Sequence, residues 1–171
     1  MGNITSPEAL SLRWAEICSD PALQDLPYKI ELNAWGKIER SPASNRHARL
    51  QGRITSELAR QLVDGGEVLT ETSVLTDIGV RVPDVAWAST EFIKAFGETT
   101  PYPKAPEICV EIISPSNTSV EIQEKTGAYL AAGAEEVWIV VEDGGVHYFD
   151  ATGEKGASRY PVTLSLPSPI S

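Results

Sequence analysis

The sequence predicts an α/β fold in which a mixed, strongly bent β-sheet is flanked by helices. Residues 108–113 form an apolar run broken by one carboxylate, which is typical of a central strand covered on both faces. Residues 45–62 repeat leucine and isoleucine at helical spacing, and residues 78–87 alternate as a strand does. The chain has 171 residues, of which 42% are hydrophobic, so it is long enough for one domain with a sizeable core.

A single domain is expected over residues 1–171, because no repeat, linker or low-complexity block interrupts the chain. Residues 1–25 form an N-terminal helical segment, in which Ser6 suits the N-cap and Pro7 suits the first helical position. The proline- and serine-rich tail, residues 167–171, is expected to fray.

Two short strands and a long helix follow the N-terminal segment. The strands are expected over residues 28–32 and 37–40. Ser44 or Asn45 caps the helix, and Gly65-Gly66 ends it. Its apolar stripe consists of Leu50, Ile54, Leu58 and Leu62.

Four or five strands are expected after the long helix, with one helix among them. This helix covers about residues 119–132, since Thr118 and Glu121 form a capping-box pattern. Residues 91–103 are expected to be an irregular connection. The C-terminal strands are residues 136–141 and 146–150, which form a hairpin, and residues 160–166, which add an edge.

Glu111 lies inside the apolar run of residues 108–113, where an ionised side chain is almost never buried unless it is paired or metal-bound. Asp84 directly follows Pro83, which indicates a sheet edge or a bend. If the two segments pair, the two acids meet. A hard cation such as Mg²⁺ needs only one or two carboxylates, with water and substrate phosphate as further ligands. Asp84 and Glu111 are therefore candidate metal ligands.

Lys125 lies on the helix predicted after Glu111, one turn before Tyr129 on the same face. A helix that crosses back over the sheet directs Lys125 at the two acids, where it orients water or stabilises developing negative charge. The alternative is a solvated lysine, or one paired with Glu121 at i,i+4.

The order of these motifs resembles the Uma2 family of restriction-endonuclease-like proteins, a PD-(D/E)xK nuclease variant abundant in cyanobacteria and some other bacteria. The matching segments are Pro83-Asp84, Val110-Glu111-Ile112-Ile113-Ser114-Pro115-Ser116, Lys125 to Tyr129, and Gly133-Ala134-Glu135-Glu136-Val137-Trp138-Ile139-Val140. The resemblance implies a restriction-endonuclease-like core and divalent-metal-dependent hydrolysis of DNA, with Mg²⁺ or Mn²⁺ as cofactor. It assigns catalytic roles to Asp84, Glu111 and Lys125, and metal binding to the two acids. Position 113 is Ile where the strict motif has Lys, and Lys125 on the helix is the matching residue.

The region upstream of residue 50 resembles the family more loosely. Glu31 and Glu39 are candidate supporting acids, and His47 is a candidate for a substrate contact or a helix cap. Tyr129 completes the supporting set. Lys37 stands where family members usually carry Glu, so no acid is assigned at that position.

The net charge of −10 runs against the usual basic surface of nucleic-acid-binding proteins. It favours either a site that recruits its substrate through a divalent cation or a protein that no longer cuts DNA. No apolar run reaches membrane-spanning length, no signal-peptide pattern is present, and the two cysteines lack metal-like spacing. A cytoplasmic protein with no membrane partner is expected.

Three functions from different classes fit these residues. The first is a metal-dependent endonuclease acting on DNA. The second is a catalytically inactive binding or regulatory module that keeps the nuclease fold. The third is an interaction protein in which Glu111 and Lys125 form a structural ion pair. A homodimer is expected for the nuclease, because symmetric dimers are common and duplex DNA has two strands to cut.

Overall fold

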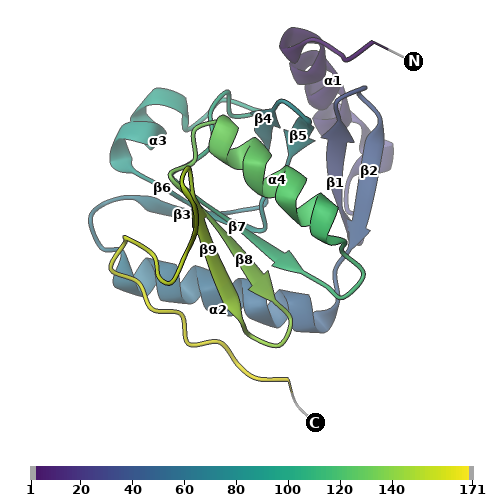
Figure 1. Ribbon diagram of the computed structural model, residues 1–171. Coiled ribbons are helices and arrows are strands. Elements are labelled where there is room, and N and C mark those ends of the chain that lie inside the picture. The colour runs from purple at the N-terminus through teal and green to yellow at the C-terminus, as the bar shows by residue number, and fades with distance from the viewer. Residues whose placement is uncertain (1–2, 170–171) are drawn as a thin grey trace.

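The computed structural model describes residues 3–169, and within this range the strands divide between two sheets (Figure 1). The helices are α1 (Pro7–Ser19), a short 3₁₀ helix η1 (Pro21–Leu23), α2 (Asn45–Gln61), α3 (Thr90–Phe96) and α4 (Ser119–Ala131). The strands are β1 (Tyr28–Asn33), β2 (Ile38–Pro42), β3 (Glu67–Thr70), β4 (Val74–Thr76), β5 (Gly79–Arg81), β6 (Val85–Ala88), β7 (Ile108–Ile113), β8 (Glu136–Val141), β9 (Val146–Asp150) and β10 (Gly153–Lys155). The smaller sheet has the order β2-β1-β5-β4, and the larger has the order β10-β9-β8-β7-β6-β3.

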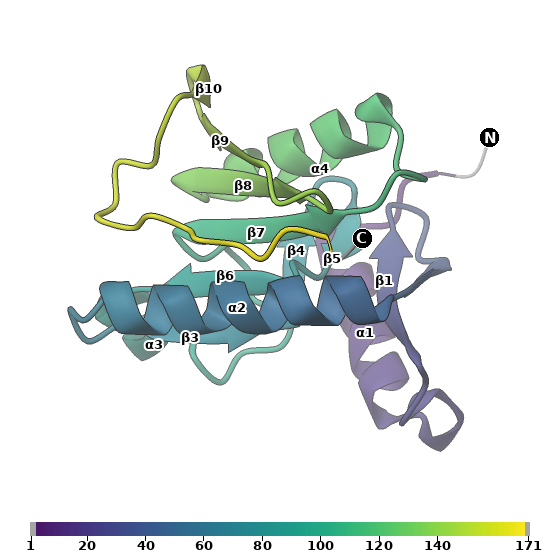
Figure 2. The same cartoon turned by 90° about the horizontal axis from the view of Figure 1, so that it is seen from below.

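The larger sheet is mixed and has helices on both faces. β7 pairs in parallel with β8 and antiparallel with β6. α2 and α4 lie on opposite faces of this sheet (Figure 2). Ile108, Val110 and Ile112 belong to the apolar cluster that includes residues of α2, whereas Cys109 belongs to the cluster that includes residues of α3 and α4. Because side chains alternate along a strand, Glu111 points to the same side as Cys109, toward α4. The predicted mixed α/β fold flanked by helices is confirmed, with the strands in two sheets.

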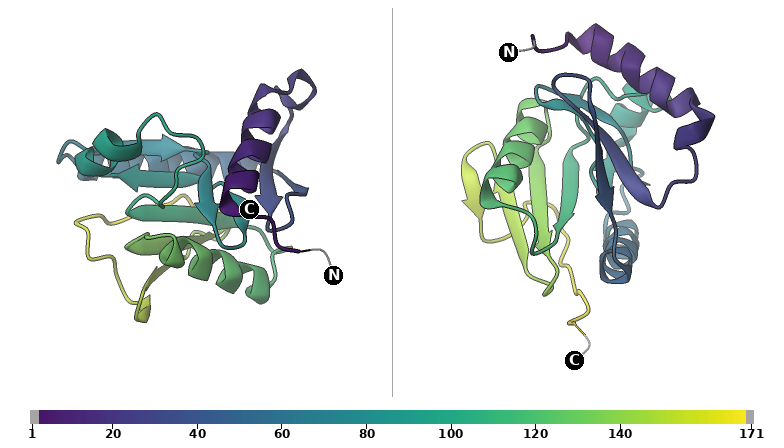
Figure 3. Two further views of the ribbon diagram at one scale, coloured as in Figure 1. Left: turned by 90° about the horizontal axis from the view of Figure 1, so that it is seen from above. Right: turned by 90° about the vertical axis from the view of Figure 1, so that its right-hand side faces the viewer.

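The smaller sheet lies with α1 at one end of the larger one (Figure 3). α1 covers its outer face through Leu10, Trp14 and Ile17, which pack against Leu32 and Val80. Since Ile30 joins the same apolar cluster, the alternate β1 residues, Lys29 and Glu31, point the opposite way. Lys29 and Glu31 therefore point toward the larger sheet.

The predicted strand over residues 78–87 is two strands. β5 belongs to the smaller sheet and β6 to the larger sheet, and Val82, Pro83 and Asp84 form the crossing between them. Proline has no N–H to continue a ladder, so the change of sheet at Pro83 is consistent with the bend expected there. Asp84 is therefore placed where the two sheets meet.

The structure also differs from the sequence predictions in residues 91–103 and 160–166. The prediction of an irregular connection over residues 91–103 is wrong, because α3 begins at Thr90, with Ser89 Oγ accepting the N-cap hydrogen bond from Phe92 N at 3.1 Å. Seven helical residues are too few to show a clear period. Residues 160–166 are not a strand, because side-chain atoms of Gln61 on α2 bond the N–H and C=O of Thr163, each at 2.8 Å. β10 forms the sheet edge instead.

The remaining elements appear near their predicted positions, including α1, the β1–β2 hairpin, α4 and the β8–β9 hairpin. α2 ends at Gln61, before the two glycines expected to end it. No helix within residues 3–169 is long and apolar enough to cross a membrane. The fraying expected for residues 167–171 extends beyond the described range and stays a prediction.

Candidate active site

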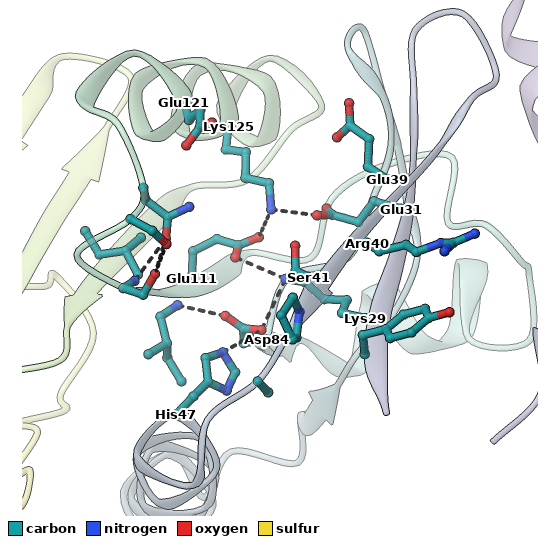
Figure 4. Close-up of a pocket in the computed structure, with 18 of the residues that line it drawn as sticks. Lys29, Glu31, Glu39, Arg40, Ser41, His47, Asp84, Glu111, Glu121 and Lys125 are labelled. Carbon is teal, nitrogen blue, oxygen red and sulfur yellow. Dashed lines mark hydrogen bonds and ion pairs between the residues drawn. The ribbon is translucent and has the colours of Figure 1, made fainter. Parts of the chain in front are cut away.

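Asp84 and Glu111 come together at the junction of the two sheets (Figure 4). The antiparallel pairing of β6 with β7 continues back to Asp84, whose N–H donates to Val110 O at 3.0 Å. Asp84 Oδ2 accepts a hydrogen bond of 2.8 Å from Ile112 N, which fixes the carboxylate beside Glu111. The two residues are 2% and 4% exposed, so both charges require partners.

Lys29, from β1, lies between the two carboxylates. Its Nζ is 3.2 Å from Asp84 Oδ1, 3.3 Å from Glu111 Oε2 and 2.9 Å from the carbonyl oxygen of Val82. Sequence reasoning missed this residue, because a lysine on a short strand is usually solvated. The available signal was the Lys29-x-Glu31 spacing, which puts two charged side chains on one face while Ile30 and Leu32 occupy the other.

Lys125 on α4 contacts the other oxygen of Glu111. Its Nζ is 3.3 Å from Glu111 Oε1 and 2.8 Å from Glu31 Oε1. Tyr129, one turn later on α4, donates its hydroxyl to the same Glu111 oxygen at 2.7 Å. Glu121 is not the partner of Lys125, since its carboxylate instead accepts a hydrogen bond from Thr118 N in the predicted capping box. α4 therefore directs both Lys125 and Tyr129 at Glu111.

Glu31 is part of this cluster and Glu39 is not. Glu31 is buried, and its second oxygen accepts a hydrogen bond of 2.9 Å from Val82 N, at the crossing between the sheets. Glu39 pairs with Arg81 at 2.6 Å and has a half-exposed side chain. Of the two supporting acids expected from the sequence, only Glu31 reaches the group formed by Asp84, Glu111 and Lys125.

His47 approaches Asp84 from the first turn of α2. Ser44 caps this helix by accepting a hydrogen bond from His47 N at 3.0 Å, which fixes the turn that carries the imidazole. His47 Nε2 is 3.2 Å from Asp84 Oδ1. Its other ring nitrogen, Nδ1, is buried and has no hydrogen-bond partner among residues 3–169. His47 thus contacts an acid of the cluster and is not the N-cap itself.

The buried charges shift one another's pKa values. Burial opposes ionisation of Asp84, but the hydrogen bond with His47 and the charge of Lys29 hold the pKa of this carboxyl well below its usual range. Burial raises the pKa of Glu111, with Asp84 and Glu31 adding to the rise against the opposing charges of Lys125 and Lys29. The two acids therefore differ in basicity although they share one site.

Lys29 and Tyr129 remain protonated in the cluster. Burial disfavours the Lys29 ammonium, but the charges of Glu111 and Asp84 outweigh it and raise the pKa of Lys29. Burial also raises the pKa of Tyr129 well above its ordinary value, so the phenol stays a donor to Glu111.

A pocket of about 870 Å³ opens beside the cluster. Lys29, Glu31, His47, Asp84, Glu111 and Lys125 all line it, together with parts of β2 and the turn after β7. Among the described residues that line it, eight are Asp or Glu and four are Lys or Arg. The pocket is large enough for part of a nucleotide, but its charge does not favour a polyanion without added cations.

The donor set at the junction is compatible with a hard divalent cation. No group of three or more His, Cys, Asp or Glu side chains within residues 3–169 is arranged as a metal cage. Mg²⁺, however, commonly uses only one or two carboxylates and completes its shell with water and phosphate. Asp84 Oδ1 and Glu111 Oε2 already converge on one positive charge, the Lys29 ammonium. These two carboxylate oxygens are suitable ligands for a divalent cation at the position of the Lys29 ammonium.

The family model of Uma2, described as "Putative restriction endonuclease", matches residues 20–169. The chain belongs to the Uma2 family. The matched range includes every residue of the cluster, and the resemblance noted in the sequence is confirmed. Membership in this family supports a nuclease function.

A solved structure similar to this Uma2 chain is a protein from Anabaena variabilis, described as "a putative nuclease belonging to DUF820". The two share 16% identity, and the match covers 82% of this chain and 81% of the other, with a TM-score of 0.61. At this identity the similarity shows the fold. A search of curated proteins finds no significant match.

Proposed function

We propose that this Uma2 chain is a metal-dependent endonuclease that hydrolyses phosphodiester bonds in DNA. The observation that carries the proposal is the direction of two buried carboxylates. Asp84 and Glu111 each point one oxygen at a single cation, while Lys125 contacts the other oxygen of Glu111. Two acids and a lysine in contact are the groups that metal-assisted phosphodiester hydrolysis requires.

Asp84 and Glu111 would hold Mg²⁺ or Mn²⁺. When bound, such a cation offsets charge on the phosphate and lowers the pKa of a coordinated water. Lys125 holds the attacking water by a hydrogen bond and stabilises negative charge that develops on the phosphate. Tyr129 and Glu31 position these groups, because Tyr129 donates to Glu111 and Glu31 accepts from Lys125.

The acidic pocket supports a requirement for cations in substrate binding. Phosphate contacts by Lys and Arg normally dominate nucleic-acid affinity, and here acids outnumber bases in the lining. Arg46 on α2 is engaged within the protein, since its Nε donates to the carbonyl oxygen of Glu142 at 2.9 Å. We expect DNA to bind measurably only when a divalent cation is present.

Calorimetric titration of Mg²⁺ and Mn²⁺, combined with a plasmid-nicking assay, tests the proposal. Asp84→Asn and Glu111→Gln should lose both metal binding and nicking. Lys125→Met should keep metal binding but nick at least about 100-fold more slowly, as expected for loss of a group that acts on the water. Glu136→Gln removes a buried acid outside the cluster and serves as the matched control, which should keep both properties.

Nicking that persists in both acid variants would contradict the proposed roles. Absence of metal binding, with Glu111→Gln lowering only stability, would leave a structural ion pair as the better account, since the Lys125–Glu111 contact that it requires is present at 3.3 Å.

The alternative of an inactive binding or regulatory module is favoured by one observation. Glu31, Asp84 and Glu111 each contact at least one of the two ammonium groups of Lys29 and Lys125, so each acid has a cationic partner without a metal. Metal binding by the wild type with no nicking of supercoiled, linear or single-stranded DNA would support this module.

We also propose that the protein acts in the cytoplasm as a homodimer, since duplex cleavage requires a cut on each strand. Sedimentation equilibrium should then give twice the chain mass of 18.5 kDa, and a monomer at micromolar concentration would contradict it.

A further inference from the structure

We propose that Lys29 is a tethered cation that occupies the metal position between Asp84 and Glu111, so that a divalent ion binds there only when the Lys29 ammonium withdraws. The inference rests on the proposed function, because it requires metal binding by these two acids. It adds a residue to the site and gives that residue a role in controlling metal affinity.

The contacts of Lys29 match those of a bound cation. An ammonium group has three N–H donors, and Lys29 Nζ has three oxygen acceptors: Val82 O at 2.9 Å, Asp84 Oδ1 at 3.2 Å and Glu111 Oε2 at 3.3 Å (Figure 4). Two carboxylate oxygens and a carbonyl oxygen are also typical ligands of hard cations. The Lys29 side chain is only 12% exposed, so it is held in this position by the protein.

The other oxygens of the two acids are engaged elsewhere. Asp84 Oδ2 accepts from Ile112 N at 2.8 Å. Glu111 Oε1 accepts from Tyr129 at 2.7 Å and from Lys125 at 3.3 Å. Asp84 Oδ1 and Glu111 Oε2 are the oxygens that the two acids direct at one point, so a metal ion held between the acids would meet the same oxygens that Lys29 contacts. Asp84 Oδ1 also lies 3.2 Å from His47 Nε2, which approaches it from α2. The ammonium and the metal compete for one pair of ligands.

Electrostatics make simultaneous occupancy unfavourable. A divalent ion on these oxygens would lie within a few ångström of the Lys29 ammonium, and like charges at that distance repel strongly in a buried site. Lys29 has a flexible four-carbon stem and lines the adjacent pocket of about 870 Å³, which gives the ammonium room to withdraw. Metal binding and withdrawal of Lys29 are then one coupled event.

Metal affinity in Lys29→Met is the direct test, with Mn²⁺ titrated into metal-free protein by calorimetry. We expect Mn²⁺ to bind at least about tenfold more tightly than to wild type, because the competing cation is gone. Lys29→Gln, which keeps polarity and most of the length, is a second variant in case Lys29→Met folds poorly.

Two control variants separate competition from general charge effects. Lys37→Met makes the same change in net charge on the exposed β1–β2 turn and should leave Mn²⁺ affinity unchanged. Lys125→Met removes the other lysine that contacts Glu111, but not from between the acids, and should raise affinity less than Lys29→Met. If Lys125→Met or Lys37→Met raised Mn²⁺ affinity as much as Lys29→Met does, the proposed competition would be wrong.

Thermal unfolding supplies a readout that is independent of catalysis. In EDTA, Lys29→Met should unfold at a lower temperature than wild type, because two buried carboxylates face each other without a cation between them. Saturating Mn²⁺ should raise the unfolding temperature of Lys29→Met more than that of wild type. A purely structural lysine predicts a loss that Mn²⁺ does not restore.

The possible failures are distinguishable. If wild type binds Mn²⁺ and both Lys29 variants bind no more tightly, the competition is wrong and the proposed function stands. If neither wild type nor the Lys29 variants bind Mn²⁺, both are wrong. Binding by the Lys29 variants alone supports the competition and favours the inactive module over the nuclease.

Discussion

Glu111 and Glu136 are buried carboxylates on the neighbouring strands β7 and β8, and their surroundings satisfy them in different ways. Glu136 accepts hydrogen bonds from neutral donors: Trp138 Nε1 at 2.7 Å, Ser158 Oγ at 2.6 Å and Arg159 N at 2.8 Å. Glu111 instead depends on two ammonium groups and a phenol. A carboxylate held by cations can exchange one of them for a metal, whereas Glu136 has no cation to exchange.

His47 should titrate above its ordinary pKa of 6.5 in metal-free protein. Its hydrogen bond with Asp84 raises the pKa, and this outweighs the opposing effect of burial. A raised folded-state pKa means that the contribution to stability is complete below pH 6.5 and is lost as pH rises through the folded-state pKa. The stability difference between wild type and His47→Gln in EDTA should therefore shrink as pH increases above 6.5.

NMR titration of the imidazole resonances, assigned with His147→Gln, measures the shift directly. Asp84→Asn should lower the pKa of His47, because the hydrogen bond and the charge that raise it are removed. A His47 pKa at or below 6.5 in wild type would contradict the contact between the two residues.

The sequence identifies the two acids of the cluster more readily than it identifies their cationic partners. Asp84 and Glu111 could be brought together from sequence because Pro83 marks the bend and the two strands pair. For Lys29, the Lys29-x-Glu31 spacing indicates only that the two side chains share one face of a strand, because a strand pattern does not encode how the smaller sheet docks against the larger. Glu39 has the same spacing signal as Glu31, yet it lies on β2 and faces Arg81.

Among the elements, β8 is joined through Glu136 to the segment after β10. Its two oxygens bond Ser158 and Arg159, and Tyr160 continues into the apolar cluster under α2. Glu136→Gln should lower the free energy of unfolding by about 1–3 kcal/mol, since at least one buried donor loses its carboxylate acceptor.

Urea unfolding measures this loss, with Glu98→Gln on an exposed loop as control, which should change stability by less than about 0.5 kcal/mol. An unchanged midpoint for Glu136→Gln would show that water replaces the missing acceptor without cost.

A helix or strand is predicted well from sequence when all the residues that define it lie within the element itself. α4 has both halves of its capping box, with Thr118 and Glu121 each bonding the other's backbone N–H, and the sequence predicts this helix. α3 has only seven residues, so the sequence around its cap at Ser89 does not predict a helix. The segment over residues 160–166 has strand-like composition, but its backbone partners are side-chain atoms of Gln61, which no local pattern reveals.

For the molecule as a whole, the two cysteines report on global unfolding. Cys109 lies on the central strand β7 and is fully buried, and burial raises the pKa of its thiol well above the ordinary value. Cys18 on α1 is exposed. A thiol reagent should therefore modify one cysteine per native chain and two in denaturant.

Mass spectrometry of the labelled protein should place the native modification on Cys18. Labelling of Cys109 at the same rate as Cys18 under native conditions would mean that the larger sheet opens far more readily than its packing implies.

The cluster joins parts of the chain that are far apart in sequence. Lys29 and Glu111 are separated by 82 positions, and Glu31 and Lys125 by 94. Contacts of such long range close large loops, so they form late in folding, after the local hairpins and helices. During synthesis, Lys29 and Glu31 leave the ribosome well before Glu111 and Lys125 exist. The N-terminal hairpin therefore keeps its charges in water until the second half of the chain arrives, and the site is completed only when Glu111 and Lys125 join it.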